Sequence, residues 1–370
     1  MSDPRPGLRE HRRMSTIGGG AMAPRGYYSA HSVPQGSAGA FGVPVLERAV
    51  DAVVIPGSPG TPFVIADLGA AGGRNELAPL ASAIGGLRER RALHGPVIVV
   101  HTDIATNDFT ALFETVEHDP ATYLRGPDVY AFAAGRSFYE RLFPPSSVSL
   151  GWSAIAVHWL SRVPVAIPDH VYCSFATGPA RDALARQSAA DWRAFLLDRL
   201  VELHGGAQLV VVGGAATDDG RSGAEGIMTA LDDALRDAVR DGRLGQDEYG
   251  SMTIPTWNRT LDDFVRPFTE DAAVAETLEL AEQSLHVLTD PFLAEYEQSK
   301  DAGAFSDAMT GFLRGFTEPS LFGTLDRPPD ERRTIADAVY AGVHERAAQD
   351  PVAVATSWRV AVLRVARRMS

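Results

Sequence analysis

Cysteine is nearly absent from this sequence, since Cys173 is the single one among 370 residues. A lone cysteine cannot form an internal disulfide, which fits a reducing compartment such as the cytoplasm. No apolar run reaches the roughly 20 residues that a helix needs to cross a bilayer. Residues 1–16 are polar and basic and lack the apolar stretch of a signal peptide. We therefore expect a cytoplasmic protein with no membrane partner.

Positive charge is also scarce, because 34 basic side chains face 47 acidic ones and the formal net charge is −13. Such a surface repels phosphate backbones, so we expect no nucleic-acid partner. The ten histidines show no H-x-x-x-H spacing and there is no C-x-x-C pair, so we expect no metal site. The absence of Gly-x-Ser-x-Gly removes the simplest hydrolase interpretation.

The order of apolar segments predicts an α/β fold. Residues 1–26 are rich in glycine, proline and arginine and are predicted to form a flexible N-terminal tail. Helical spacing is found at 41–54, 75–91 and 182–204. Short apolar runs predict strands at 62–68, 96–102, 129–133, 208–213 and 352–365, with a further element at 171–175.

Strands that alternate with helices indicate a mostly parallel sheet covered on both faces. We expect about seven strands in a core built from residues 27–215 and 345–370, closed by an antiparallel strand. Residues 216–344 are more helical and more acidic, and they are predicted to form a mainly helical cap over the pocket.

A glycine-rich loop carries the first functional signal. Asp67-Leu68-Gly69-Ala70-Ala71-Gly72-Gly73 directly follows a predicted buried strand. In the G-x-G-x-x-G fingerprint of dinucleotide-binding proteins the first position is glycine, whereas here it is Asp67, a poor neighbour for phosphate. An acid at this position suits a cationic ligand such as a sulfonium nucleoside. Asp103 ends the next strand, where a carboxylate can accept hydrogen bonds from both ribose hydroxyls. Two acids in ordinary turns remain an alternative at this point.

Further segments resemble, in order, the SABATH family of S-adenosylmethionine (SAM)-dependent methyltransferases, with this chain as a bacterial-type member. That family methylates carboxylates such as salicylate, benzoate and jasmonate and, in a side branch, xanthine nitrogens. The matching segments are Tyr28-x-x-His31-Ser32-x-x-Gln35, Ala66-Asp67-Leu68-Gly69 with Asn75, Asp103 with Asn107-Asp108-Phe109, Ser137-Phe138-Tyr139, and His158-Trp159-Leu160-Ser161.

The resemblance implies a Rossmann-like class I methyltransferase core, SAM as the cofactor, S-adenosylhomocysteine (SAH) as its product, and a homodimer. The implied cofactor-binding residues are Tyr28, Ser32, Asp67, Gly69, Asn75, Asp103, Ile104, Ser137 and Phe138. Gln35 and Trp159 are expected to orient the carboxylate of the substrate. The implied lining of the substrate pocket adds Tyr139, Ile155, His158, Met228, Trp257, Leu313 and Phe316.

We expect these residues to form the methyl ester of a small aromatic or apolar carboxylic acid. A carboxylate with a pKa of about 4 is already ionised near neutral pH, so no general base is needed. N-methylation of a heterocycle and a non-catalytic cofactor-binding protein are the alternatives. Trp159 could belong only to the core, and His158 could be a pocket wall, a donor to the substrate or a core histidine.

Overall fold

The structure, a computed structural model, describes residues 20–57 and 60–369. Seven strands form one sheet in the order β3-β2-β1-β4-β5-β7-β6. The strands are β1 Phe63–Leu68, β2 Val97–Asp103, β3 Val129–Gly135, β4 Val148–Ala154, β5 Leu203–Ala215, β6 Leu278–Thr289 and β7 Ser357–Arg367. From β3 to β5 all neighbours are parallel, and β7 is antiparallel to β5 and β6. The predicted core of about seven mostly parallel strands is confirmed.

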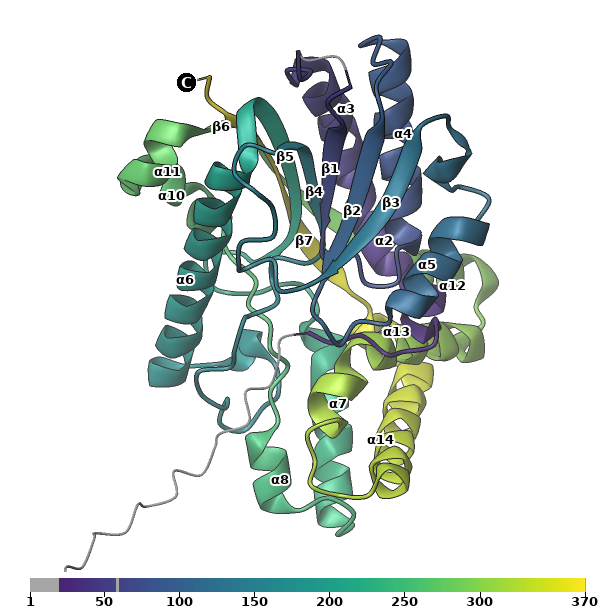
Figure 1. Cartoon of the computed structure of the whole chain (residues 1–370). Helices are drawn as coiled ribbons and strands as arrows, with labels where there is room; N and C mark the ends of the chain where they lie inside the picture. The colour runs from purple at the N-terminus through teal and green to yellow at the C-terminus, as the bar shows by residue number, and fades with distance from the viewer. Residues whose placement is uncertain (1–19, 58–59, 370) are drawn as a thin grey trace, which may run out of the picture.

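Helices cover both faces of this sheet (Figure 1). One face carries α2 Val33–Gly39, α3 Val43–Ala52, α4 Arg74–Glu89 and α5 Phe109–His118. The other face carries α6 Gly178–Glu202, α9 Leu261–Val265, α10 Pro267–Glu270 and α11 Ala272–Thr277. Short 3-10 helices span Ala40–Gly42, Tyr123–Arg125 and Cys173–Phe175. Strands buried on both faces explain the continuous apolar runs of β1 and β5.

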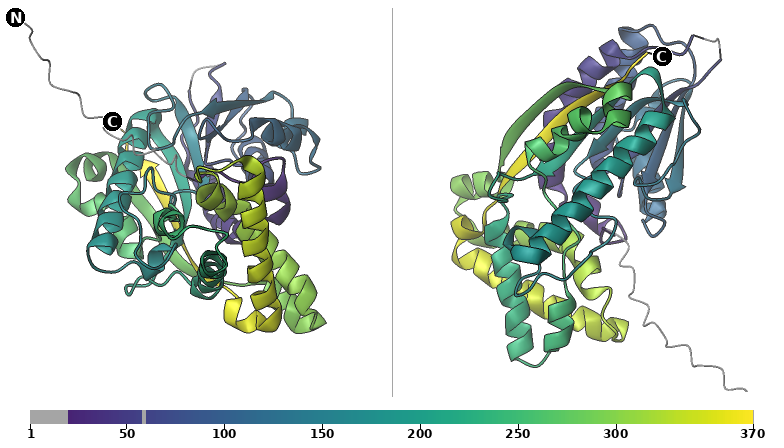
Figure 2. Two further views of the ribbon diagram at one scale, coloured as in Figure 1. Left: turned by 90° about the horizontal axis from the view of Figure 1, so that it is seen from below. Right: turned by 90° about the vertical axis from the view of Figure 1, so that its left-hand side faces the viewer.

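A helical cap lies against the carboxyl-terminal ends of the parallel strands, below the sheet in Figure 1 and nearest the viewer in the left view of Figure 2. It contains α7 Glu225–Arg240, α8 Gln246–Ser251, α12 Pro291–Ser299, α13 Ala302–Phe322, α14 Pro329–Gln349 and α15 Pro351–Val354. Buried side chains such as Leu231, Met309 and Val339 form its apolar core. The cap therefore faces the sheet edge where open α/β folds bind ligands.

The segments of the structure differ from the sequence-based prediction in several places. β6 lies inside 216–344, the range expected for the cap, because an edge strand with polar side chains at Glu279, Glu282 and Gln283 does not read as a buried strand. β4 was not predicted, since Ser149, Gly151 and Ser153 dilute its apolar pattern. The element expected at 171–175 is a 3-10 helix. The helices α9 to α11 also lie inside 216–344 but pack on the sheet, and the cap helices α14 and α15 extend into 345–354, which was expected in the core.

The N-terminal segment packs against the cap. Residues 1–19 of the predicted tail lie outside the described residues. Residues 20–26 were also expected in the tail, but they pack on α13. The backbone N–H of Ala23 donates to the carbonyl of Gly315 in that helix at 2.8 Å. The short helix α1, Tyr27–His31, continues along α13 and leads into α2. This segment therefore closes one side of the space between sheet and cap.

Candidate active site

Two adjoining cavities lie between the sheet edge and the cap. The first, which we name the glycine-loop cavity, is lined by residues 69–76 and by Asp103, Ile104, Ser137 and Phe138. The second, the cap cavity, is lined by His158, Met228 and Phe316 among others. Residues that line both cavities are Met22, Tyr28, Gln35, Ile155 and Trp159. The two cavities are therefore neighbours that share a wall.

The glycine loop joins β1 to α4 and requires glycine at its first turn. Gly69 has a φ of 96°, and a Cβ built there would lie 2.4 Å from Cβ of Ala156. A side chain would therefore strain the backbone and clash. The loop is tied to β2 because Ala71 N–H donates to Oδ2 of Asp103 at 2.7 Å. Backbone atoms of this loop consequently line the cavity.

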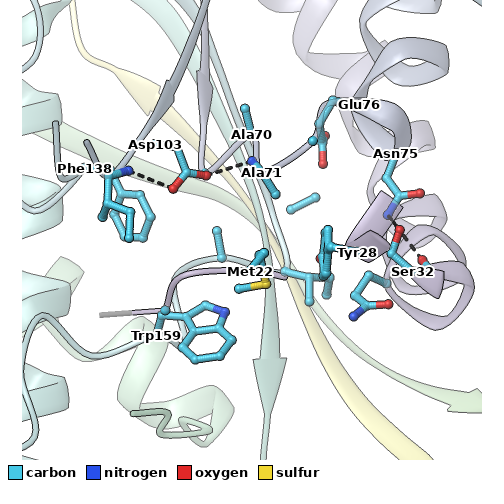
Figure 3. A pocket seen from close by; sticks show the side chains of 18 of the residues that line it. Met22, Tyr28, Ser32, Ala70, Ala71, Asn75, Glu76, Asp103, Phe138 and Trp159 are labelled. Atoms are coloured by element: carbon cyan, nitrogen blue, oxygen red, sulfur yellow. Dashed lines mark hydrogen bonds between the residues drawn. The ribbon is translucent and has the colours of Figure 1, made fainter. Parts of the chain in front are cut away.

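Asp103 ends β2 and lies next to the glycine loop (Figure 3). Its Oδ1 accepts from Ile104 N–H at 2.7 Å, and its Oδ2 accepts from Ala71. Burial raises the pKa of Asp103 to about 6, against the effect of these two donors, and the charge of Asp67 adds to the rise. Each oxygen keeps a second lone pair for a hydroxyl donor. The carboxylate can therefore accept hydrogen bonds from a bound diol while its orientation stays fixed.

Asp67 does not line either cavity, which corrects its expected place among the cofactor-binding residues. The parallel register pairs Asp67 with His101 of β2. Their side chains meet on the same face, with His101 Nδ1 2.6 Å from Oδ2 of Asp67 and His101 Nε2 2.6 Å from the Tyr123 hydroxyl. Asp67, His101 and Tyr123 therefore form a buried hydrogen-bond network beneath the loop.

On the α4 side of the loop, Ser32 and Asn75 are joined directly. Asn75 Nδ2 donates to Oγ of Ser32 at 3.0 Å and to its carbonyl at 3.3 Å. In Figure 3 Tyr28 lies beside Ser32, toward the middle of the view, and below Asn75. Sequence reasoning missed Glu76, which follows Asn75, lines the same cavity and accepts a hydrogen bond from the indole N–H of Trp152. The sequence offered one indication of this role for Glu76, namely that it directly follows Asn75, a residue expected to bind the cofactor.

On the β2–β3 side, Ile104, Ser137 and Phe138 line the cavity as expected. Ser137 Oγ accepts from Tyr139 N–H at 3.2 Å, which fixes the turn. The Phe138 ring meets Tyr139 edge-on, with centroids 4.7 Å apart. These contacts hold an aromatic ring where a planar ligand can pack.

The segment from Ile155 to Trp159 forms the wall between the cavities. Ile155 has a φ of 51°, a left-handed conformation that costs a β-branched residue about 1–3 kcal/mol. The Tyr139 hydroxyl donates to the carbonyls of Val157 at 3.0 Å and Trp159 at 2.6 Å. Tyr139, expected to contact substrate, lines the glycine-loop cavity and holds this wall in place.

Gln35 and Trp159 lie on opposite elements, α2 and the 155–159 segment, and are 7% and 9% exposed. Oε1 of Gln35 is buried and has no hydrogen-bond partner among the described residues. In Figure 3 the indole nitrogen of Trp159 points toward Met22 and the centre of the cavity. A Cβ on Gly20 would lie 2.7 Å from the ring, so the N-terminal segment packs closely on Trp159. Each side chain offers N–H donors at the junction of the cavities.

The cap cavity is lined by apolar side chains together with several polar ones. Met228, Phe316 and Ile155 line it as predicted. Burial, and secondarily the charge of Arg259, lowers the pKa of His158 to about 4, so this ring is neutral at pH 7. Lining residues that sequence reasoning missed are Met22, Tyr172, Gly214, Ala215, Ser222, Ala224, Thr256, Asn258, Trp358 and Arg359.

Trp257 and Leu313 line neither cavity, which corrects their predicted role. The backbone at 256–258 is extended beside Trp159, so Thr256 and Asn258 face the cap cavity and Trp257 faces away. Leu313 is fully buried. One turn later on the same side of α13, the hydroxyl of Thr317 is hydrogen-bonded to the hydroxyl of Tyr340 of α14. Leu313 therefore faces α14, while Phe316, about 60° further round the helix, faces the cavity.

Across 20–57 and 60–369, no group of three or more His, Cys, Asp or Glu side chains is arranged to hold a metal ion. None of the helices in that part of the chain is long and apolar enough to cross a membrane.

The strand order with an antiparallel β7, the glycine loop after β1 and the acid at the end of β2 define a Rossmann-like methyltransferase fold. Residues 14–350 match the family model described as SAM dependent carboxyl methyltransferase. This chain belongs to that family, and its cofactor is SAM.

Relatives and a solved structure agree with this assignment. Methyltransferase LUC1 of Fusarium sp is 30% identical over 67% of this chain and 66% of its own length. Indole-3-acetate O-methyltransferase 1 of Oryza sativa subsp. japonica is 29% identical over 76% of this chain and 79% of its own length. The protein of that name from Arabidopsis thaliana is 29% identical over 55% of this chain and 59% of its own length. A loganic acid methyltransferase structure with SAH has the same fold, with a TM-score of 0.74, 19% identity, and coverage of 94% of this chain and 98% of that one.

The residues of the glycine-loop cavity fit SAM. Asp103 and Glu76 are its two carboxylates, and Arg74 is the one basic side chain among the described lining residues. This charge balance suits a ligand that carries a sulfonium and an ammonium group. The glycine loop leaves room for backbone contacts that a Cβ would fill.

Proposed function

We propose that this protein transfers the methyl group of SAM to a carboxylate oxygen of a small, aromatic or otherwise apolar carboxylic acid and forms its methyl ester. The observation that carries the proposal is the meeting of the two cavities at Gln35 and Trp159. SAM would lie in the glycine-loop cavity and the acid in the cap cavity. A wall with N–H donors from two sides suits an anion with two oxygens.

SAM, when bound, supplies an electrophilic methyl group on a positively charged sulfur. Asp103 would accept hydrogen bonds from the ribose hydroxyls, and Phe138 and Ile104 would pack on the adenine. Ser32 and Asn75 would contact the methionine part. Together these residues would fix where the methyl group points.

Gln35 Nε2 and Trp159 Nε1 would each donate to one oxygen of the substrate carboxylate. They would orient one oxygen lone pair toward the methyl carbon, and the gain from such positioning is large. No proton has to move, since the acid is already ionised near pH 7. His158, neutral with a pKa of about 4, supports this mechanism because it is a weak base there.

The apolar lining of the cap cavity supports an apolar acid. Phe316, Met228 and Trp358 would pack on the body of the substrate and keep water from the reacting charges. Attack by a carboxylate on a sulfonium removes both charges, so a water-poor site favours the reaction.

A panel of small acids incubated with SAM that carries a trideuterated methyl group tests this proposal. We expect a methyl ester of at least one aromatic or apolar acid, identified by mass spectrometry. Methylation of a neutral heterocycle with no ester from any acid would favour the N-methyltransferase alternative. Tight SAM binding with no product from either class would favour a non-catalytic role.

We also propose a cytoplasmic homodimer. The lone Cys173 supports a reducing compartment, and the family resemblance of the sequence supports the dimer. Analytical ultracentrifugation at micromolar concentration tests the second point, and a monomer throughout would contradict it.

A further inference from the structure

Glu76 is a buried carboxylate at the SAM cavity that none of the steps above uses. It is 6% exposed, lies in the first turn of α4 and lines the glycine-loop cavity. In Figure 3 it lies on the α4 side of Ala70 and Ala71, while Asp103 lies on the opposite side. The carboxylate therefore borders the part of the cavity near Ser32 and Asn75.

The partners of Glu76 leave its charge uncompensated. Trp152 of β4 donates one neutral hydrogen bond to Oε2. Among the described residues, the groups that act on its charge are Asp67 of β1 and Tyr28 of α1, and neither is a cation. Arg74 lines the same cavity but forms no salt bridge with Glu76. Burial, with the charge of Asp67 acting in the same direction, raises the pKa of Glu76 well above its ordinary value. A buried carboxylate without a cation is costly, and a cationic ligand in the cavity would offset that cost.

Glu76 is also the carboxylate available on that side of the cavity. Asp67 does not line the cavity and pairs with His101. Asp103 lies across the loop, where both its oxygens accept backbone N–H groups. Asn75 donates to Ser32 through its amide nitrogen. An ammonium group that enters near Ser32 therefore meets Glu76 as its charged acceptor.

We propose that Glu76 binds the α-ammonium group of the methionine part of SAM. This inference rests on the proposed placement of SAM in the glycine-loop cavity. The ammonium has N–H donors for a charge-assisted bond to the carboxylate, whereas the sulfonium has none. The ligand brings the cation that this buried acid lacks, so Glu76 positions the cofactor along the cavity.

The test measures binding by calorimetry with the Glu76→Gln variant of the full chain. Glutamine keeps an oxygen acceptor for Trp152 and removes the charge. The matched control is Glu89→Gln, an exposed acid at the other end of α4. The ligands are SAM, SAH, decarboxylated SAM, and 5′-methylthioadenosine, which lacks the amino-acid part altogether.

We expect Glu76→Gln to weaken the binding of SAM, SAH and decarboxylated SAM by about tenfold to a hundredfold. Binding of 5′-methylthioadenosine should change less than about twofold, and Glu89→Gln should match the wild type with all four ligands.

Three results would overturn the assignment. Unchanged SAH affinity would make the sulfonium the partner, and unchanged affinity for decarboxylated SAM would make the α-carboxylate the partner. An equal loss for 5′-methylthioadenosine would mean that Glu76 is only structural. A wild-type protein that binds no SAM would instead contradict the proposed function, so the two failures are distinguishable.

Discussion

Replacement of Trp159 by phenylalanine removes one indole N–H from the junction of the two cavities and keeps an aromatic ring. The backbone contacts of residue 159 survive, because its N–H donates to Ala156 at 3.0 Å and its carbonyl accepts from Tyr139 at 2.6 Å. The ring is nearly buried and meets Phe316 edge-on with centroids 6.4 Å apart, so some packing is lost.

Loss of one donor to a charged oxygen costs about 1.5–3 kcal/mol, or roughly tenfold to a hundredfold in kcat/KM for the acid. The smaller ring should lower the free energy of unfolding by about 0.5–3 kcal/mol. SAM affinity should stay within about twofold, since the donor is proposed to contact the substrate. Gln35→Ala should have an effect on kcat/KM of the same size, and the double variant should exceed either single one.

The assay measures melting temperature, SAM affinity by calorimetry and kcat/KM for the acid on the same preparations. Trp192→Phe is the matched control, because its indole N–H is also buried but donates to the carbonyl of Phe264 at 3.0 Å, away from both cavities. It should melt lower and keep full kcat/KM. A Trp159→Phe enzyme that melts lower yet retains full kcat/KM would refute the carboxylate contact and leave Trp159 as a core residue.

Two further predictions concern pH. Because Asp103 has a raised pKa of about 6 and accepts hydroxyls best when ionised, affinity for 5′-methylthioadenosine, which has the ribose but no ammonium group for Glu76, should fall as pH drops through 6, by about tenfold per unit below it. Calorimetry with that ligand should find the fall missing in Asp103→Asn, and its persistence there would contradict the assignment. Because His158 stays neutral above about pH 4, kcat at saturating SAM should be flat from about pH 6.5 to 8. A limb near 6.5 that disappears in His158→Asn would instead make His158 a general base.

The sequence predicted those parts of the site that depend on local pattern. Gly69 and Asp103 follow buried apolar strands, and the carboxyl ends of neighbouring parallel strands meet at one edge, so their proximity was predictable. Asp67 was misplaced because side-chain direction depends on the register with His101, which a single strand does not encode. Trp257 and Leu313 were misplaced for the same reason, since their direction depends on the neighbouring backbone and on α14.

Other parts were beyond sequence reasoning because they depend on long-range packing. Met22 and Gly20 lie in a glycine-rich segment that looks flexible, yet contacts with Gly315 and Trp159 place it against the site. β6 is an edge strand whose polar side chains hide its pairing with β7. Glu76 reads as an ordinary first-turn acid of a helix until its burial at the cavity is known.

The central claim, direct attack of a substrate carboxylate on the methyl group of SAM, is tested most directly by isotopes. An acid methylated in the panel would be prepared with 18O in both carboxyl positions and incubated with SAM that carries a trideuterated methyl group. Mass spectrometry should find an ester that retains both 18O atoms and gains the intact trideuterated methyl group. Loss of one 18O atom would reveal an activated acyl intermediate, and an unlabelled methyl group would exclude SAM as the donor; either result would contradict the account.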